Sequence, residues 1–391
     1  MGIIVQKYGG SSVADVEKIG LVADKVVAAK RSGHDVVVVV SAMGKTTDEL
    51  LALAKGVAKD PPRRELDMLV STGERVSMAL LAIAIQSRGE AAISFTGSQS
   101  GIITNDRHFD ARIIEVKPHR IEDELGAGRI VIVAGYQGMS YKREITTLGR
   151  GGSDTTAVAL AAALGAERCE IYSDVDGVYS ADPRVVADAR HLPEIDLEML
   201  QELAEAGAKV LNAQAVEWAR KAKITLHARK TADFPPAAGV TPKETVAREA
   251  TNERASGARA VASMDRIALA ELGVDGLPGL LEALTELDLP LYDANSAGGE
   301  ASVVIPLLNV PDWDKRRAAL ARRAGPALKL SEGLSVVSVV GDGLGGRAAL
   351  AWRAFGPSLR AFHGGPLRLS GVVPAAESPA VVRALHERFC V

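Results

Sequence analysis

The sequence has few of the residues that would direct the chain to metals, nucleic acids or membranes. Of its 391 residues only two are cysteines and 4% are aromatic, and the net charge is −3. Cys169 and Cys390 form no metal-like spacing and no disulfide framework, which fits a reducing compartment, and we expect both to be buried packing residues. Lysine and arginine are spread along the chain, so no nucleic-acid surface is expected.

Long hydrophobic runs are also missing. Apolar runs such as Val36–Val40 are far too short to span a bilayer. The N-terminus enters the apolar run Ile3–Val5 without the basic and long apolar segments of a signal peptide. These absences predict a cytoplasmic protein without a membrane partner. What the chain does have is 47% apolar residues, enough over this length for two or three hydrophobic cores.

Short apolar runs alternate with helical patterns over the first 230 residues. Such alternation indicates an α/β domain with a parallel sheet covered by helices. The predicted strands are Ile3–Lys7, Val36–Ser41, Ala92–Thr96, Ile130–Ala134, Cys169–Ser173 and Ile224–Arg229. The predicted helices lie near Val13–Ser32, Glu65–Ser87, Asp154–Leu164 and Glu198–Lys221.

The composition changes after this domain. Residues 231–258 are rich in proline, glycine, threonine and charge, which we interpret as an interdomain connection. Residues 259–391 contain a weak internal repeat in which a strand, a glycine-containing turn, a helix and further strands recur. This order predicts two small ferredoxin-like α+β modules, and their lack of catalytic chemistry suggests regulation or dimerisation.

One glycine loop leads directly into a helical pattern at Leu148–Thr156. Asp154, Thr155 and Thr156 supply the chemistry of a helix start, and free amides and a positive dipole end would face the glycines. Arg150 adds a forked cation. The sequence therefore predicts an anion site, although a glycine turn before an ordinary core helix is the plainer alternative.

Polar loops follow several of the other predicted strands and helix starts. Lys7 ends the first strand and precedes Gly9, Gly10 and Ser11, an order opposite to that of the usual phosphate loop, and a solvent-reaching lysine is an equal alternative. In open α/β sheets ligands lie outside the carboxyl ends of the strands, so these loops should converge. The other loops are 41–47, with Ser41 and Thr47, and 71–75, with Glu74.

The stretch Tyr172–Arg184 carries acids, hydroxyls and one arginine behind a strand. A calcium loop is one interpretation, but Val175 and Val178 interrupt it and no closing glutamate follows. Nucleotide binding explains the stretch better, with Asp174 and Tyr179 for sugar and base, and Arg184 and the later Lys209 for phosphates. A tight polar loop stabilised by Asp174 and Asp176 is the plain alternative.

These motifs together resemble the successive signatures of the aspartokinases, over the first 230 residues. The motifs are Lys7–Ser12, Ser71–Glu74, Leu148–Thr156, Tyr172–Arg184 and Gly207–Leu211. The resemblance implies a three-layer amino acid kinase domain at 1–230, followed by paired ACT-type modules. It implies transfer of the γ-phosphate of ATP, with Mg²⁺, to the side-chain carboxylate of L-aspartate, the entry step to lysine, threonine and methionine. It also implies a homodimer or higher homo-oligomer.

Roles carry over from the family to matching positions. The resemblance implies that Lys7, Asp154 and Lys209 are catalytic, with Lys7 on the transferring phosphoryl group. The aspartate site would comprise Ser41, Thr47, Glu74, Arg150, Ser153 and Asp154, in which Glu74 and Asp154 face the amino group and Arg150 the α-carboxylate. The ATP site would comprise Lys7, Gly9, Gly10, Ser11, Ser173, Asp174, Tyr179, Arg184 and Lys209. No side chain is an obvious magnesium ligand, so phosphate oxygens and water would dominate its shell.

The chain departs from the family pattern in two places. Asn212–Gln214 replaces a histidine-proline-arginine-like segment, and we expect altered packing or nucleotide affinity there. The effector-binding strands of the ACT-type modules are not recognisable at 292–299 and 359–369, which predicts weak or absent feedback inhibition. Another amino acid kinase, or a non-catalytic amino-acid-sensing partner, is the alternative function.

Overall fold

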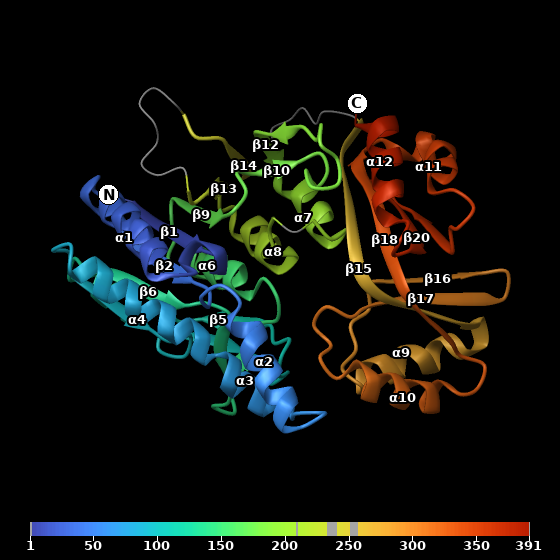
Figure 1. The fold of residues 1–391 in the computed structure, drawn as a ribbon, viewed down its shortest axis with the longest axis horizontal. Coiled ribbons are helices and arrows are strands. Elements are labelled where there is room, and N and C mark those ends of the chain that lie inside the picture. Colours follow the sequence, from blue (N-terminus) through green and yellow to red (C-terminus); the bar gives the residue numbers. More distant parts are fainter. Residues whose placement is uncertain (1, 209, 233–240, 251–256, 391) are drawn as a thin grey trace. The chain divides into compact units, whose positions relative to one another are not determined.

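The computed structural model describes residues 2–208, 210–232, 241–250 and 257–390. The chain divides into two compact units, each built from more than one segment (Figure 1). The first comprises Met1–Val178, His191–Ala204 and Lys209–Thr251. The second comprises Tyr179–Arg190, Glu205–Ala208 and Asn252–Val391.

An eight-stranded sheet forms the centre of the first unit. Its strand order is β12-β14-β13-β9-β1-β2-β6-β3, and every neighbouring pair is parallel except β13 with β14. The strands are β1 (Ile3–Tyr8), β2 (Asp35–Val40), β3 (Ala92–Phe95), β6 (Ile130–Ala134), β9 (Arg168–Ser173), β12 (Glu194–Asp196), β13 (Leu226–Lys230) and β14 (Glu244–Arg248). The predicted mainly parallel α/β sheet is confirmed.

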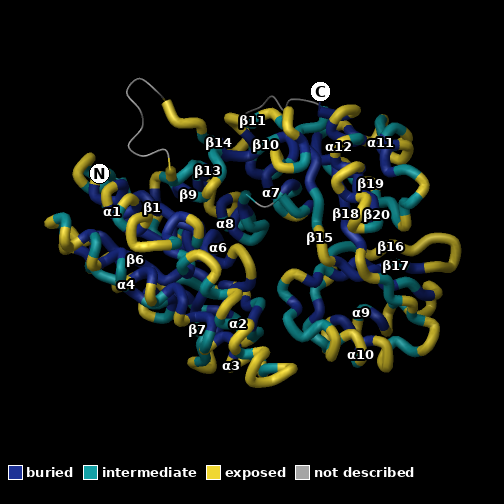
Figure 2. The backbone as a smooth tube through the Cα atoms, in the orientation of Figure 1, coloured by how far each residue is buried: buried dark blue, intermediate teal, exposed yellow. Residues whose placement is uncertain are grey.

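Helices cover both faces of this sheet. α1 (Val16–Arg31) and α4 (Thr72–Gln86) pack against alternate residues of the central strands, among them Ile4, Val38 and Ile132. α6 (Gly152–Ala163) contacts β1, β2 and β9 from the other face and is covered in turn by α8 (Ala213–Ala222). The five consecutive valines of β2 are fully buried, as expected of a strand with helices on both sides (Figure 2).

Smaller elements extend the first unit. A four-stranded sheet has the order β5-β4-β7-β8, from Ile113–Val116, Ile102–Thr104, Gln137–Ser140 and Ile145–Thr147. The remaining helices are α2 (Thr46–Val57), α3 (Arg63–Val70), α5 (His119–Gly126) and α7 (Leu197–Glu205). The helical stretch Arg63–Gln86 is long and apolar enough to cross a membrane, but half of its apolar window is buried within the fold, as in the core helices of soluble proteins.

A six-stranded antiparallel sheet forms the second unit, in the order β16-β17-β15-β18-β20-β19. β15 (Gly257–Gly273) and β18 (Lys329–Asp342) are long and run through both predicted repeats. The shorter strands are β16 (Asp293–Ala297), β17 (Glu300–Pro306), β19 (Ala361–Gly364) and β20 (Arg368–Pro374). The predicted α+β repeats are therefore present, joined through shared strands.

Each repeat of the second unit has its own core. α9 (Leu277–Glu286) and α10 (Trp313–Ala324) pack on one half of the sheet. α11 (Ala348–Phe355) and α12 (Ser378–Phe389) pack on the other, together with Ala181 and Val186 from the segment Tyr179–Arg190. That segment belongs by sequence to the kinase-like part but by packing to the second unit.

The structure differs from the sequence interpretation in two places. The predicted helix 198–221 is two helices, α7 and α8. The break lies at Gly207, whose φ of 102° is left-handed and where a Cβ would lie 2.5 Å from the Ser263 carbonyl oxygen. The predicted connection 231–258 contains β14, which pairs with β12 and β13 in the first unit's sheet, and the start of β15.

Two isoleucines of α4 provide a matched test of the core. Ile85 is 0% and Ile83 is 63% exposed. We expect Ile85→Ala to lower the free energy of unfolding by about 2–5 kcal/mol, because it leaves a cavity between α4 and the sheet. Ile83→Ala should change it by less than about 0.5 kcal/mol. Urea denaturation of the two variants checks this, and equal effects would contradict the packing described.

Candidate active site

A buried ion pair joins the end of β1 to the start of α6. Lys7 Nζ lies 2.7 Å from Asp154 Oδ1, and the two side chains are 11% and 10% exposed. The loop after β1 contains Gly9, at which a Cβ would lie 3.4 Å from the Lys7 ammonium. The backbone N–H of Gly9 donates to the carbonyl of Tyr172 at the end of β9, 3.1 Å away. The Lys7 ammonium therefore lies at the carboxyl edge of the sheet, and no side chain covers it from position 9.

The loop after β2 closes against the same glycines. A Cβ at Gly10 would lie 2.8 Å from the carbonyl oxygen of Ala42, and Gly44 N–H donates to the Gly10 carbonyl at 3.0 Å. Ser41 N–H donates to the Tyr8 carbonyl at 3.1 Å. The carboxyl ends of β1, β2 and β9 are therefore bound to one another, which confirms the predicted convergence of these loops. Ser11 is exposed beside them.

Glu74, in the first turn of α4, points back to this junction. Its Oε1 accepts a hydrogen bond from Ala42 N–H at 3.0 Å, and the residue is 2% exposed. Its Oε2 has no hydrogen-bond partner among the described residues. Burial raises the pKa of this carboxyl to about 7, opposed in part by the N–H groups of Glu74 and Ala42. A cation arriving at Oε2 would favour the ionised form.

The start of α6 differs in detail from the sequence interpretation. The helix begins at Gly152, and Gly151, with φ of 79°, caps it, so Asp154 lies in the first turn and pairs with Lys7 instead of capping. Two of the first amides already have acceptors: Gly152 N–H donates to Gly149 and Asp154 N–H to Gly151, both at 3.0 Å. Fewer amides are available to an anion than the glycine loop predicts.

The predicted substrate residues are placed in two different environments. Ser153 is buried in the first turn of α6 beside Gly135, whose Cβ would lie 2.7 Å from the Ser153 hydroxyl. Arg150 is 55% exposed on the glycine loop, and its guanidinium pairs with Asp48 of α2 at 3.0 Å. Thr47 is half-buried next to Asp48. The glycine loop before α6 and the start of α2 are thus linked by an ion pair.

Sequence reasoning missed the loop after β6. Gly135 N–H donates to the Val40 carbonyl at 2.9 Å, Tyr136 N–H to the Thr156 hydroxyl at 3.2 Å, and Gln137 to the Ser71 carbonyl at 2.8 Å. This loop ties β2, α6 and the start of α4 together. Its signal was available, since Gly135 directly follows a predicted strand, but it carries no charged residue.

Beyond Lys7 and the loop after β1, the predicted nucleotide residues fall in three groups. Ser173 ends β9 and its hydroxyl accepts from Val175 N–H at 3.2 Å, beside the exposed Asp174. Tyr179 and Arg184 belong to the second unit, where the Arg184 guanidinium bonds both carboxylate oxygens of Asp182, at 3.0 and 2.8 Å. Lys209 lies outside the described residues.

Asn212, where the chain departs from the family pattern, connects α8 to the glycine loop. Its carboxamide oxygen accepts from Gln214 N–H at 2.9 Å, which caps α8, and from the Thr155 hydroxyl at 3.2 Å. Its amide donates to the Arg150 carbonyl at 2.9 Å. A Cβ at Gly151 would lie 2.7 Å from that amide. The substitution therefore fixes the backbone of the Arg150–Gly151 turn.

Metal-ligating side chains do not cluster in the part of the chain that the structure describes: no three His, Cys, Asp or Glu residues lie close enough to hold an ion. Cys169 and Cys390 are both buried, as expected.

The Amino acid kinase family model matches residues 2–229. An aspartokinase from Mycolicibacterium smegmatis is 41% identical over all of this chain and 96% of its own length. The chain belongs to the aspartokinases. An Escherichia coli aspartokinase III structure in complex with aspartate and ADP has a TM-score of 0.86 at 25% identity, covering 98% of this chain and 99% of its own. Its complex with lysine and aspartate gives 0.71 at 25% identity, covering 99% of each chain. This chain is accordingly an aspartate kinase, a phosphotransferase of amino-acid biosynthesis.

The raised pKa of Glu74 predicts a pH dependence of stability. The unfolded carboxyl ionises near pH 4.5 and the folded one near pH 7, so unfolding releases a proton between these values. The free energy of unfolding should therefore fall as pH rises through this window, by up to ~3 kcal/mol. Glu74→Gln should remove this fall, as followed by urea denaturation at pH 5 and 8.

Glu49→Gln, on the exposed side of α2, is the control and should retain the fall. If Glu74→Gln and the wild type lost the same stability between the two pH values, the assigned protonation of Glu74 would be wrong.

Proposed function

We propose that this aspartate kinase works by positioning and charge neutralisation around the Lys7–Asp154 pair. A carboxylate nucleophile is already ionised at neutral pH and needs no general base, so the main obstacle is repulsion between it and the phosphates. The observation that supports the proposal is the 2.7 Å contact, which holds the Lys7 ammonium at the carboxyl end of β1. There it would neutralise the transferring γ-phosphoryl group of ATP.

Glu74 and Asp154 are proposed to receive the amino group of L-aspartate. Both are buried acids on helix first turns, and Glu74 Oε2 has no partner among the described residues. Ser41, Thr47 and Ser153 would complete the site with hydroxyls. Arg150 would bind the α-carboxylate by exchanging its contact with Asp48, at little cost because both side chains are exposed.

ATP is proposed to enter at the ends of β1 and β9. Gly10 and Ser11 would offer donors to its phosphates, and Gly9, whose N–H donates to the Tyr172 carbonyl, would leave room for them beside Lys7. Ser173 and Asp174 at the end of β9 would bind the remainder. Tyr179, Arg184 and Lys209 are retained as nucleotide residues on the family resemblance alone. Mg²⁺ would come with the nucleotide and be held by phosphate oxygens and water, adding positive charge to the transferred group.

We also propose a cytoplasmic homodimer or higher homo-oligomer, formed through the second unit. Its long antiparallel sheet has the edge strands β16 and β19, where unpaired backbone groups could pair with another copy. Analytical ultracentrifugation over a range of protein concentrations measures the mass of the assembly and tests the proposed oligomer.

Lys7→Ala tests the catalytic proposal. We expect kcat to fall about 10²- to 10³-fold, because one preorganised charge at the phosphoryl group is lost. Binding of L-aspartate, measured by calorimetry, should remain. An ATP-dependent hydroxamate assay measures turnover.

Lys55→Ala, on the exposed face of α2, is the matched control and should leave kcat unchanged. Undiminished turnover in Lys7→Ala would remove Lys7 from the phosphoryl site, and lost aspartate binding would place it in the substrate site instead.

Feedback control is proposed to be weak or absent. β16 lies at a sheet edge with four of its five residues exposed. The effector-binding strand of the family is not recognisable in this segment. We expect lysine, threonine, or both at sub-millimolar concentration to leave turnover nearly unchanged. Strong inhibition in the same hydroxamate assay would reject this part of the proposal and leave the kinase chemistry intact.

A further inference from the structure

A cation-lined pocket lies on the opposite face of the sheet from Lys7. Side chains of β1 alternate, so Ile4 and Gln6 face this pocket while Lys7 faces α6. The pocket has a volume of about 450 Å³, within the range of small-molecule sites. The C-terminal turn of α1 forms one wall, and β9, β13 and the start of β14 form the others.

Charge in this pocket is unbalanced. Its titratable lining comprises five permanent cations, Lys25, Arg168, Arg229, Lys230 and Lys243, two carboxylates, Glu170 and Glu244, and His34. The excess among the lining residues is three positive charges with histidine neutral, and Glu167, just outside the lining, offsets one of them by binding Arg168 at 2.6 Å. The carbonyl end of α1 opposes this excess, but two of its carbonyls already accept: Ala28 from Ser32 N–H at 3.0 Å and Ala29 from the Ser32 hydroxyl at 2.8 Å.

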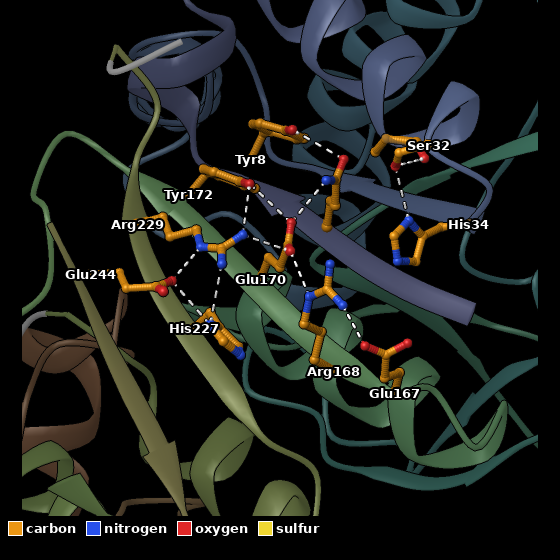
Figure 3. A network of polar contacts seen from close by, with 12 residues as sticks. Tyr8, Ser32, His34, Glu167, Arg168, Glu170, Tyr172, His227, Arg229 and Glu244 are labelled. Atoms are coloured by element: carbon orange, nitrogen blue, oxygen red, sulfur yellow. Dashed lines mark hydrogen bonds and ion pairs between the residues drawn. The ribbon is translucent and has the colours of Figure 1, made fainter. Parts of the chain in front are cut away.

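The buried Glu170 and the half-buried Glu244 fix the two guanidinium groups in place (Figure 3). Glu170, 2% exposed, accepts from Arg168 at 2.8 Å, Arg229 at 2.7 Å and Gln6 at 2.9 Å. Although burial acts to raise it, the pKa of Glu170 is lowered by the neighbouring arginines. Glu244 binds Arg229 from the other side and also His227, at 3.0 Å. The pocket wall is therefore preorganised and retains positive charge.

Two further lysines, Lys230 and Lys243, add positive charge to the lining. Neither has an acidic partner within the described part of the chain. Lys25 is buried, and its ammonium lies over the Tyr172 ring, 4.2 Å from the centroid. Tyr8 stacks on the same ring with centroids 4.8 Å apart, so Tyr172 offers no platform for a nucleotide base.

We propose that this pocket binds the phosphate group of a small, non-aromatic metabolite, or free phosphate, at a site separate from the kinase site. Arginine and lysine arranged about a cavity of this size match the charge and oxygens of phosphate. The ring of Tyr172 is occupied, which disfavours a second nucleotide. A phosphorylated metabolite and free phosphate would both place a phosphate group among these cations. They differ only in what fills the remaining volume of the pocket.

Isothermal titration calorimetry with inorganic phosphate tests the proposal. The full chain is first saturated with L-aspartate and a non-hydrolysable ATP analogue with Mg²⁺, so that the γ-phosphate position of the kinase site is also occupied, and KCl holds the ionic strength constant. We expect saturable binding of one phosphate. Lys243→Glu, an exposed residue at the pocket rim, should weaken it about tenfold or more, because one attraction becomes a repulsion. Lys55→Glu, the same charge change on α2, should not.

Turnover of Lys243→Glu in the hydroxamate assay should match the wild type, which separates this proposal from the kinase chemistry. No saturable phosphate binding, or equal weakening by Lys243→Glu and Lys55→Glu, would overturn it. Lys230→Ala is the second variant and should also weaken phosphate binding. In a competition arm, tighter binding of glycerol 3-phosphate than of phosphate would identify an esterified ligand, and tighter binding of phosphate the free ion.

Discussion

The Lys7–Asp154 ion pair is the constraint on which the site depends. Burying two charges is costly unless they are paired closely, and here β1 and α6 hold them 2.7 Å apart. The partners come from elements separated by most of the first unit's chain, so the pair forms only when α6 lies against the centre of the sheet. Glycines lie close to both partners: Gly9 leaves the Lys7 ammonium uncovered, and Gly151 leaves room for the side chain of Asn212.

A second constraint is the close packing of loops above the strand ends. The loops after β1, β2, β6 and β9 are joined by backbone hydrogen bonds, and Glu74 is enclosed by them. Enclosure raises the pKa of this carboxyl, so the same packing that builds the site also sets the charge it carries before a substrate arrives. A change in the packing of these loops would therefore also change the pKa of Glu74.

The sequence predicted the meeting of Lys7, Glu74 and Asp154 because parallel strands place their carboxyl ends at one edge. It could not predict that Asp154 would pair with Lys7, since that depends on the depth of α6 against β1. The loop Gly135–Gln137 escaped notice because it contributes through backbone and amide groups, which leave little trace in a charge pattern. The repeat of the second unit was visible, but strands long enough to serve both copies were not, because β15 contains two charged, exposed residues, Asp265 and Arg266, that interrupt its apolar pattern.

Segment Tyr179–Arg190 has a consequence for the order in which the protein can be made. The Ser180 hydroxyl lies 2.8 Å from His386 Nε2, a contact 206 residues apart in sequence, and Ala181 and Val186 are buried among residues of α11 and α12. Those helices are synthesised after the segment, from residues that follow it by more than 150 positions. The segment therefore lacks its final packing until both helices have been made. A nascent kinase unit with its central sheet already formed would still lack the final placement of Tyr179 and Arg184.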